Sequence, residues 1–230
     1  MCIIVAKPQG VNMPSMKTLR TCFKHNHDGA GFAYLDNGNV IYKKGFMSFN
    51  SLKKALDDLD INKKETTMVF HFRIGTSGTN SKGLTHPFKI CGDTETMKAT
   101  EGTGSVLFHN GILADYNPSK DNKDDVNDTM LFTKNVINEL PKDWETNKAI
   151  LSLVKKSINS NKLAILKPNK LTLIGNFKKD KGIYYSNDSY KEYKSIYTYV
   201  PKYSYYDPYY DDYYDYRGRN NCQWSKKEVI

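Results

Sequence analysis

The sequence predicts an α+β protein whose sheets are antiparallel. Runs rich in β-branched and aromatic residues come first along the 230-residue chain, helical segments follow, and strand-like runs return near the end. The regular alternation of strand and helix that builds a parallel sheet is missing from this order. Two turn signals, Asn37-Gly38 and Pro168-Asn169, each separate a pair of strand-like runs and indicate antiparallel hairpins.

In the first hundred residues, strands are expected beside two amphipathic helices. The apolar run at 2–6 is typical of a buried strand. Met13-Pro14-Ser15 opens a short helix, and Ser48 caps another whose apolar stripe includes Leu52 and Leu56. The remaining expectations here are strands at 31–36, 39–44 and 66–73, and a long functional loop with short strands in it at 75–104.

The second half is expected to place two helices between strands. A strand at 105–109 ends at Asn110-Gly111. Helices follow at 125–140 and 144–158, with Pro141 as the break between them. The closing elements are a hairpin formed by 163–167 and 171–175, and a short strand at 184–187.

Composition divides the chain into a domain at 1–190 and a low-complexity tail at 191–230. Fourteen of the 17 tyrosines lie from residue 184 onward, where aliphatic residues are scarce, so we expect this tail to be mostly disordered. The 7 Lys/Arg and 7 Asp/Glu from residue 184 onward cancel, so the net charge of +9 belongs to residues 1–183. We favour a solvated Lys-rich surface over a nucleic-acid-binding patch, because no nucleic-acid-binding motif accompanies the basic residues.

The sequence also predicts a cytoplasmic protein without a cofactor. It has neither an 18-residue apolar run nor a basic-then-apolar leader, which predicts no membrane span and no secretory signal. The spacing of its four cysteines fits free thiols in a reducing compartment. His25 and His27 lack a third ligand at a fitting spacing, and no glycine-rich phosphate loop is present, so we expect neither a metal nor a nucleotide cofactor.

Cys2 is the leading candidate for a nucleophile. Its small side chain permits removal of Met1, which would leave a thiol and a free α-amine on one residue. An α-amine has a reference pKa of about 7.7–8.0 and can act as the base that activates the thiol. Many chains begin Met-Cys by chance, so the hypothesis depends on the other residues that could complete a site.

Three further segments could supply that site, and each also has an ordinary structural interpretation. Arg73 at a strand end could bind a carboxylate in bidentate fashion, or simply point into solvent. The Asn110 amide beside the Gly111 N–H could form an oxyanion hole, although Asn-Gly is also a common turn. Asp128 at a helix start could bind an ammonium group or serve as a cap.

Taken together, these segments resemble the class II glutamine amidotransferase domain of the N-terminal-nucleophile hydrolases. The resemblance covers about residues 2–190, and the motifs keep the family's order. The motifs are Cys2, His27-Asp28-Gly29-Ala30-Gly31, His71-x-Arg73 with Thr76 and Gly78, His86-Pro87-Phe88, His109-Asn110-Gly111, Asp128-Thr129 and Gly182-Ile183-Tyr184-Tyr185-Ser186-Asn187.

The resemblance implies a four-layer αββα sandwich of two antiparallel sheets and a role for each site residue. Cys2 would be the nucleophile that forms a thioester with glutamine and releases ammonia. Asn110 and Gly111 would hold the oxyanion. Arg73 would bind the α-carboxylate with Thr76 nearby, and Asp128 would bind the α-ammonium. The glutamine amide would then be hydrolysed to glutamate, with ammonia passing to an acceptor.

Two features depart from the family pattern. Ile74 and Ser77 stand where well-known members have an aromatic residue and a histidine, and a Tyr-rich tail stands where a fused synthase domain usually follows. The ammonia acceptor is therefore expected on a separate partner protein. Two alternatives stay open: an amide hydrolase of the same fold with another substrate, and a non-catalytic interaction protein that uses the basic domain and the tail.

Overall fold

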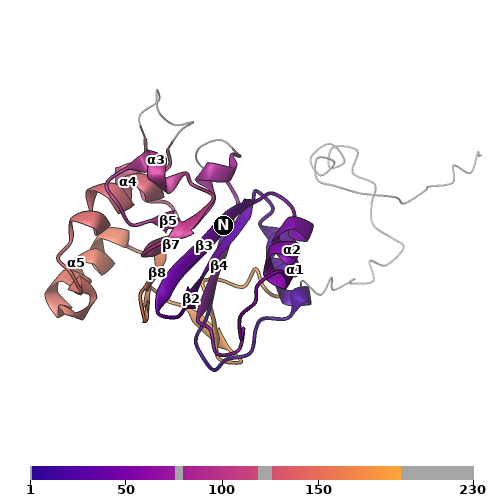
Figure 1. Ribbon diagram of the computed structural model, residues 1–230. Coiled ribbons are helices and arrows are strands. Elements are labelled where there is room, and N and C mark those ends of the chain that lie inside the picture. The colour runs from indigo at the N-terminus through magenta and orange to yellow at the C-terminus, as the bar shows by residue number, and fades with distance from the viewer. Residues whose placement is uncertain (1, 76–79, 119–125, 193–230) are drawn as a thin grey trace, which may run out of the picture. The chain divides into compact units, whose positions relative to one another are not determined.

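The computed structural model describes residues 2–75, 80–118 and 126–192. Over these ranges the chain is α+β, with two antiparallel sheets and several helices, which confirms the predicted class (Figure 1). No helix in the same ranges is both long and apolar enough to cross a membrane.

The larger sheet has the strand order β10-β11-β1-β4-β2-β3-β6. In chain order the bounds are β1 (Ile3–Lys7), β2 (Ala30–Asp36), β3 (Asn39–Phe46), β4 (Met68–Phe72), β6 (Glu101–Thr103), β10 (Lys178–Asp180) and β11 (Ile183–Tyr185). β1 pairs antiparallel with β4 on one side and β11 on the other. Its residues are apolar on both faces because both faces are covered: Ile3 and Val5 join one core cluster, Ile4 and Ala6 another.

The smaller sheet has the order β5-β7-β8-β9. Its strands are β5 (Phe88–Lys89), β7 (Val106–Asn110), β8 (Lys162–Lys167) and β9 (Lys170–Ile174). β8 and β9 form the hairpin predicted at Pro168-Asn169, and Asn169 adopts a left-handed φ of 57° at the turn. β7 pairs with β5 and β8, so the Asn110-Gly111 pair at its end is not a hairpin turn.

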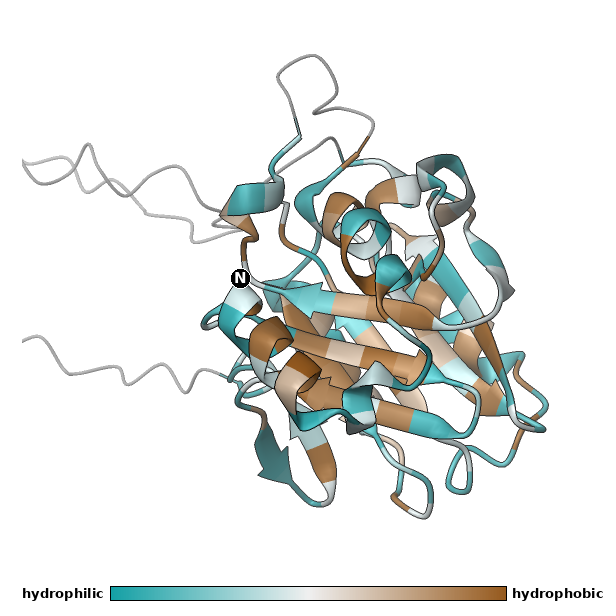
Figure 2. Cartoon of the chain, turned by 90° about the vertical axis from the view of Figure 1, so that its left-hand side faces the viewer, coloured by the Kyte–Doolittle hydropathy of each residue, from teal (hydrophilic) through white to brown (hydrophobic). Residues whose placement is uncertain are grey.

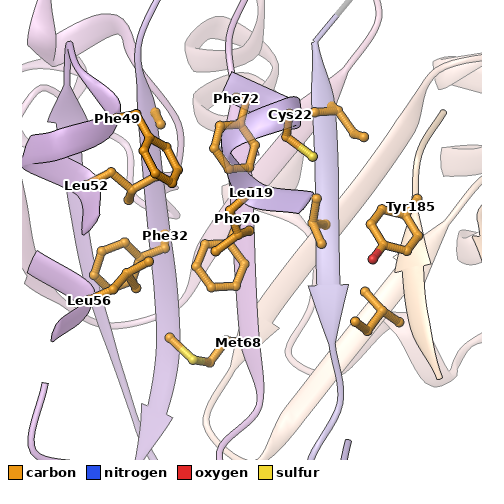
Figure 3. Close-up of a cluster of buried hydrophobic side chains, with 14 of the residues drawn as sticks. Leu19, Cys22, Phe32, Phe49, Leu52, Leu56, Met68, Phe70, Phe72 and Tyr185 are labelled. Atoms are coloured by element: carbon orange, nitrogen blue, oxygen red, sulfur yellow. The ribbon is translucent and has the colours of Figure 1, made fainter. Parts of the chain in front are cut away.

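Two helices cover the outer face of the larger sheet. α1 (Met16–His25) follows the predicted opening at Met13-Pro14-Ser15 and is capped by the Ser15 side chain, and α2 (Phe49–Asp57) is capped by Ser48, as predicted. Figure 3 shows their apolar side chains packed against the strand side chains of this face. The helix residues are Leu19, Cys22, Phe49, Leu52 and Leu56, and the strand residues include Phe32, Met68, Phe70, Phe72 and Tyr185.

The inner faces of the two sheets share a second cluster, and further helices pack on the smaller sheet. Ile4 and Val69 of the larger sheet cluster with Phe108 and Ala164 of the smaller one. The other face of the smaller sheet packs against α4 (Asp128–Asn135) and α5 (Lys148–Ile158). In Figure 2 hydrophobic segments run along the central strands, while connections are mostly hydrophilic.

The structure corrects two expectations about elements. The segment 75–104 contains the expected short strands, β5 and β6, but it also holds a 3₁₀ turn at Lys82–Leu84 and α3 (Thr94–Met97), which were not expected. The helix expected at 125–140 ends at Asn135 and continues as a 3₁₀ turn at Ile137–Glu139. Ile137 packs in the cluster under α5, so tertiary contacts decide the backbone there.

Two smaller differences have local causes. α5 begins at Lys148, later than Trp144, because the Asn147 side chain accepts from the N–H groups of Ala149 and Ile150 and caps the helix. β10 was not expected, since its exposed lysines give no apolar signal.

One compact unit spans Met1–Glu192. Residues 193–230 lie outside the described residues, so the tail and its boundary stay predictions.

Candidate active site

Cys2 lies just before β1, beside the chain that leaves β4. Its Sγ accepts a hydrogen bond from Ile74 N–H at 3.3 Å and donates to Ile74 O at 3.4 Å. The Asn187 side chain donates to Cys2 O at 2.6 Å and fixes the backbone. Burial raises the pKa of the Cys2 thiol, so thiolate formation at neutral pH requires a nearby base.

Asn110 is the last residue of β7 and is almost completely buried. Its Nδ2 donates to the Ser186 hydroxyl at 2.7 Å, and the same hydroxyl accepts from Ile4 N–H at 2.8 Å. Ile4 belongs to β1, two residues from Cys2 in sequence. Ser186 therefore connects the strand that begins at the thiol with the side chain predicted to face it.

One cavity of about 390 Å³ brings together the three residues predicted to be catalytic. Cys2, Asn110 and Gly111 line it together with Ile74. The rest of the described wall consists of Ile112, Leu113, Ala114, Asp115, Tyr116, Ser157, Asn159, Ser160, Asn161 and Lys162. A thiol, an amide and a glycine N–H on one cavity are the groups that thiol-based amide cleavage requires.

Arg73 is buried behind Cys2, outside the described wall of that cavity. Its Nη1 donates to Asn80 Oδ1 at 2.8 Å, and Asn80 Nδ2 donates to Asp28 Oδ1 at 3.3 Å. Asp28 Oδ2 also accepts from Gly75 N–H at 2.8 Å. Burial lowers the pKa of Arg73, opposed by the nearby Cys2 and Asp28. Thr76, predicted beside the substrate carboxylate, lies outside the described residues.

Asp128 lies one layer behind the cavity wall. Its Oδ2 accepts from the N–H of Leu113, a wall residue, at 2.8 Å. Its Oδ1 accepts from Thr129 N–H at 2.7 Å. Asn127, rather than Asp128, caps the helix by accepting from Met130 N–H at 3.0 Å. The carboxylate is thus available for more than capping, although both of its oxygens already accept hydrogen bonds.

Three buried histidines join the sheets beneath the site. His71 of β4 donates from Nε2 to His109 O of β7 at 2.9 Å, and the rings of His71 and His86 have centroids 4.0 Å apart. Burial lowers the pKa of His71 to about 3 and lowers those of His86 and His109. These rings are therefore neutral at physiological pH. His71 and His109 make hydrogen bonds, whereas the His86 ring packs between them and neither of its nitrogens has a hydrogen-bond partner among the described residues.

Sequence reasoning missed the functional contacts of Ser186, Asn187 and Asn161. Ser186 and Asn187 follow the last strand within a segment that the resemblance included, but their contacts to Asn110 and Cys2 carry no local signal. Asn161 belongs to a polar turn between α5 and β8 that is typical of any helix end. Only the fold shows that its side chain reaches the chain after Gly111.

Comparison of the chain with protein-family models and with curated proteins finds no match. Among the described residues, no group of three or more His, Cys, Asp or Glu side chains is arranged to hold a metal ion.

Proposed function

We propose that this protein is an amide hydrolase that uses Cys2 as an N-terminal nucleophile and takes glutamine as substrate, in the manner of class II glutamine amidotransferases. One observation carries the proposal: Cys2 lines the same cavity as Asn110 and Gly111. Cys2 precedes β1 of the larger sheet, whereas Asn110, which is 108 positions later in the sequence, ends β7 of the smaller sheet. The sequence motifs predicted that Cys2, Asn110 and Gly111 would lie close together.

The layered arrangement supports assigning the fold to the N-terminal-nucleophile hydrolases. Helices pack on the outer face of each of the two antiparallel sheets, whose inner faces share a core. β1, which directly follows the proposed nucleophile, lies inside the larger sheet. A four-layer αββα sandwich of this kind would hold Cys2 rigidly against the end of β7.

In the proposed reaction, the free α-amine of Cys2 takes the thiol proton, directly or through a water molecule. The thiolate attacks the side-chain amide carbon of glutamine, and the tetrahedral oxyanion accepts hydrogen bonds from Asn110 and Gly111. The C–N bond then breaks as the leaving nitrogen takes the proton, giving ammonia and a γ-glutamyl thioester. Water attacks the thioester carbonyl, which releases glutamate and regenerates the free thiol.

Asn110 keeps hydrogen-bonding capacity for this role. An amide nitrogen has two N–H groups, and the contact with Ser186 uses one of them. The second N–H of Asn110 Nδ2 makes no hydrogen bond within the described residues and could donate to the oxyanion. Removal of one oxyanion donor typically lowers the rate by about 10²–10³-fold.

Arg73 and Asp128 would recognise the α-carboxylate and the α-ammonium of glutamine. The guanidinium carries a positive charge and a planar set of N–H donors that matches a carboxylate, and Asn80 Oδ1 fixes its orientation from one side. Asp128 supplies negative charge directly behind Leu113 of the cavity wall. Recognition of opposite charges at one end of the substrate would reject simple amides that lack them. The released ammonia would pass to an acceptor on a separate protein.

A second candidate, hydrolysis of a larger amide by the same thiol, is favoured by one observation. Arg73 and Asp128 do not line the cavity within the described residues, whereas the cavity extends along Ile112–Tyr116 and the turn after α5. A γ-glutamyl or acyl amide could bind along that part of the cavity without contacting Arg73 or Asp128. Rates on a panel of amides separate the candidates: a strong preference for a substrate other than glutamine would favour the second.

The decisive test is Cys2→Ala in protein whose N-terminus has been defined by intact mass. We expect glutamate release from glutamine to be abolished, because the nucleophile is lost. Cys91→Ala is the matched control, since Cys91 lies outside the cavity wall, and it should keep full activity. Glutamate release by Cys2→Ala at the wild-type rate would refute the proposal.

A further inference from the structure

The turn after β7 requires a glycine at position 111. Gly111 has φ of +144°, a conformation that side-chain-bearing residues rarely adopt. Strand pairing to β8 ends at Asn110, so the regular ladder does not hold the backbone of residues 111 and 112. Oxyanion stabilisation depends on where the Gly111 N–H points, and something other than the sheet must fix it.

The side chain of Asn161 provides that support. Its Oδ1 accepts from Ile112 N–H at 2.6 Å, and its Nδ2 donates to Ile112 O at 3.1 Å. An amide side chain carries the same donor and acceptor as a peptide group, so Asn161 pairs with Ile112 as a neighbouring strand would. Nδ2 also donates to Ile158 O at 2.7 Å, which anchors the amide to the end of α5.

Gly111 and Asn161 are fitted to each other. A Cβ added at Gly111 would lie 1.4 Å from Asn161 Oδ1, so the amide occupies the space that any side chain at 111 would need. Asn161 also lines the cavity that holds Cys2. The contact is therefore part of the site's wall and lies directly beside the proposed oxyanion donor.

We infer that Asn161 is the positioning residue of the oxyanion hole: its amide holds Ile112 and thereby aims the Gly111 N–H at the reacting carbonyl. This inference rests on the proposed function. Asn161 touches neither the thiol nor, in the proposed reaction, the substrate amide. Its effect passes through the backbone of Gly111, so it should alter the transition state more than ground-state binding.

A hydrogen-bonded chain extends from Asn161 toward Asp128. His109 Nε2 lies 3.2 Å from Asn161 Oδ1, and His109 Nδ1 lies 2.8 Å from Thr129 Oγ1. Because Asn161 Oδ1 only accepts, the His109 proton is on Nε2 and Nδ1 accepts from the threonine hydroxyl. The Thr129 backbone N–H donates to Asp128 Oδ1 at 2.7 Å, so the chain reaches the carboxylate through the backbone of Thr129. Asn161 is thus held from a second direction by residues next to the proposed ammonium-binding carboxylate.

The test compares Asn161→Ala with Asn176→Ala, the same chemical change at an exposed position outside the cavity wall. Glutamate release and alkylation of Cys2 by iodoacetamide are measured in each. Alkylation is a displacement that forms no oxyanion, so it reports the thiol alone. For Asn161→Ala we expect kcat to fall about 10–100-fold, KM to change less than about 3-fold, and Cys2 alkylation to stay within about 2-fold of wild type.

A second variant covers the case in which Asn161→Ala does not fold. Asn161→Asp keeps the acceptor for Ile112 N–H and His109, but it cannot donate to Ile112 O and it places negative charge beside the oxyanion. We expect it to fold and to lose kcat selectively as well. Unchanged kcat in the folded variants would overturn the inference, and so would a parallel loss of kcat and alkylation. Wild-type protein that releases no glutamate would instead refute the proposed function.

Discussion

At the residue scale, Ser186 connects the two parts of the site. Its buried hydroxyl accepts from Ile4 N–H and from Asn110 Nδ2, so it fixes the strand that follows Cys2 and the proposed oxyanion donor together. Ser186→Ala removes both contacts and leaves the Ile4 N–H buried without a partner. Such a loss typically costs about 1–3 kcal/mol of stability.

We therefore expect Ser186→Ala to lower the free energy of unfolding by about 1–3 kcal/mol, measured by urea denaturation. We also expect kcat for glutamine to fall about 10-fold or more, because the Asn110 amide is released. Ser189→Ala is the control, since the Ser189 hydroxyl makes no hydrogen bond within the described chain. Wild-type stability in Ser186→Ala would contradict the structural account.

Gly111→Ala tests the close approach of Asn161. The new Cβ would collide with Asn161 Oδ1 and would adopt an unfavourable φ. We expect kcat to fall about 100-fold, because the N–H is displaced from the oxyanion. Gly10→Ala is the matched control: Gly10 also has a positive φ, of 75°, but a Cβ there meets nothing within 4 Å. Equal kcat in the two variants would show that the collision is unimportant.

Local sequence predicted the residues with distinctive chemistry but not the residues that hold them. Cys2, Asn110 and Gly111 stood out because a thiol after Met1 and an amide beside a glycine are recognisable as residue types. Asn161 could not be recognised, because its partner Ile112 is 49 positions away and its turn is an ordinary polar one. Pairing across such distances is a property of the fold.

At the scale of elements, the segment 75–104 shows what composition could not predict, which is how the segment is tied to the sheets. Its Gly, Thr and Ser content is typical of a loop. In the fold, the buried Lys44 of β3 donates to Gly83 O at 2.9 Å and to Met97 O, and its ammonium lies 4.4 Å from the centroid of Phe88. One long side chain thus ties three parts of the segment to the larger sheet.

Lys44 should make stability depend on pH. Burial lowers its pKa to about 7 in the folded chain, against about 10.4 when exposed. Between these values the unfolded chain binds more protons, so the free energy of unfolding rises with pH from 7 toward 10, and the destabilising contribution is complete below pH 7. We expect Lys44 to add roughly 2 kcal/mol to the wild-type rise between pH 7 and 9.

Lys44→Met should therefore flatten the pH dependence, whatever its effect on stability at any single pH. Urea denaturation at pH 7, 8 and 9 measures the slope. Lys43→Met is the control on the same strand, since the Lys43 side chain makes no hydrogen bond or ion pair within the described residues. A slope in Lys44→Met as steep as that of the wild type would show that this ammonium does not set the dependence.

At the scale of the whole molecule, the site lies where the two sheets meet. Cys2 leads into β1 of the larger sheet and Asn110 ends β7 of the smaller one, while the His71–His109 hydrogen bond joins the sheets below them. The shared apolar cluster holds the sheets at a fixed spacing. The antiparallel class was predictable from the order of elements, whereas this spacing depends on side chains distributed over the entire chain.

The last prediction concerns the C-terminal segment. Cys2, Arg73, Asn110, Gly111, Asp128 and the supporting residues up to Asn187 all belong to the compact unit that spans Met1–Glu192. A chain ending at Glu192 should therefore fold, with a melting temperature within a few degrees of the full chain, and should hydrolyse glutamine with a kcat/KM within about 3-fold of it. Thermal unfolding and glutamate release measure both quantities. If the segment serves a partner, only ammonia transfer to that partner should be lost. Loss of hydrolysis in the shortened chain would mean that the active site needs residues beyond 192, and the two-sheet site described above would be incomplete.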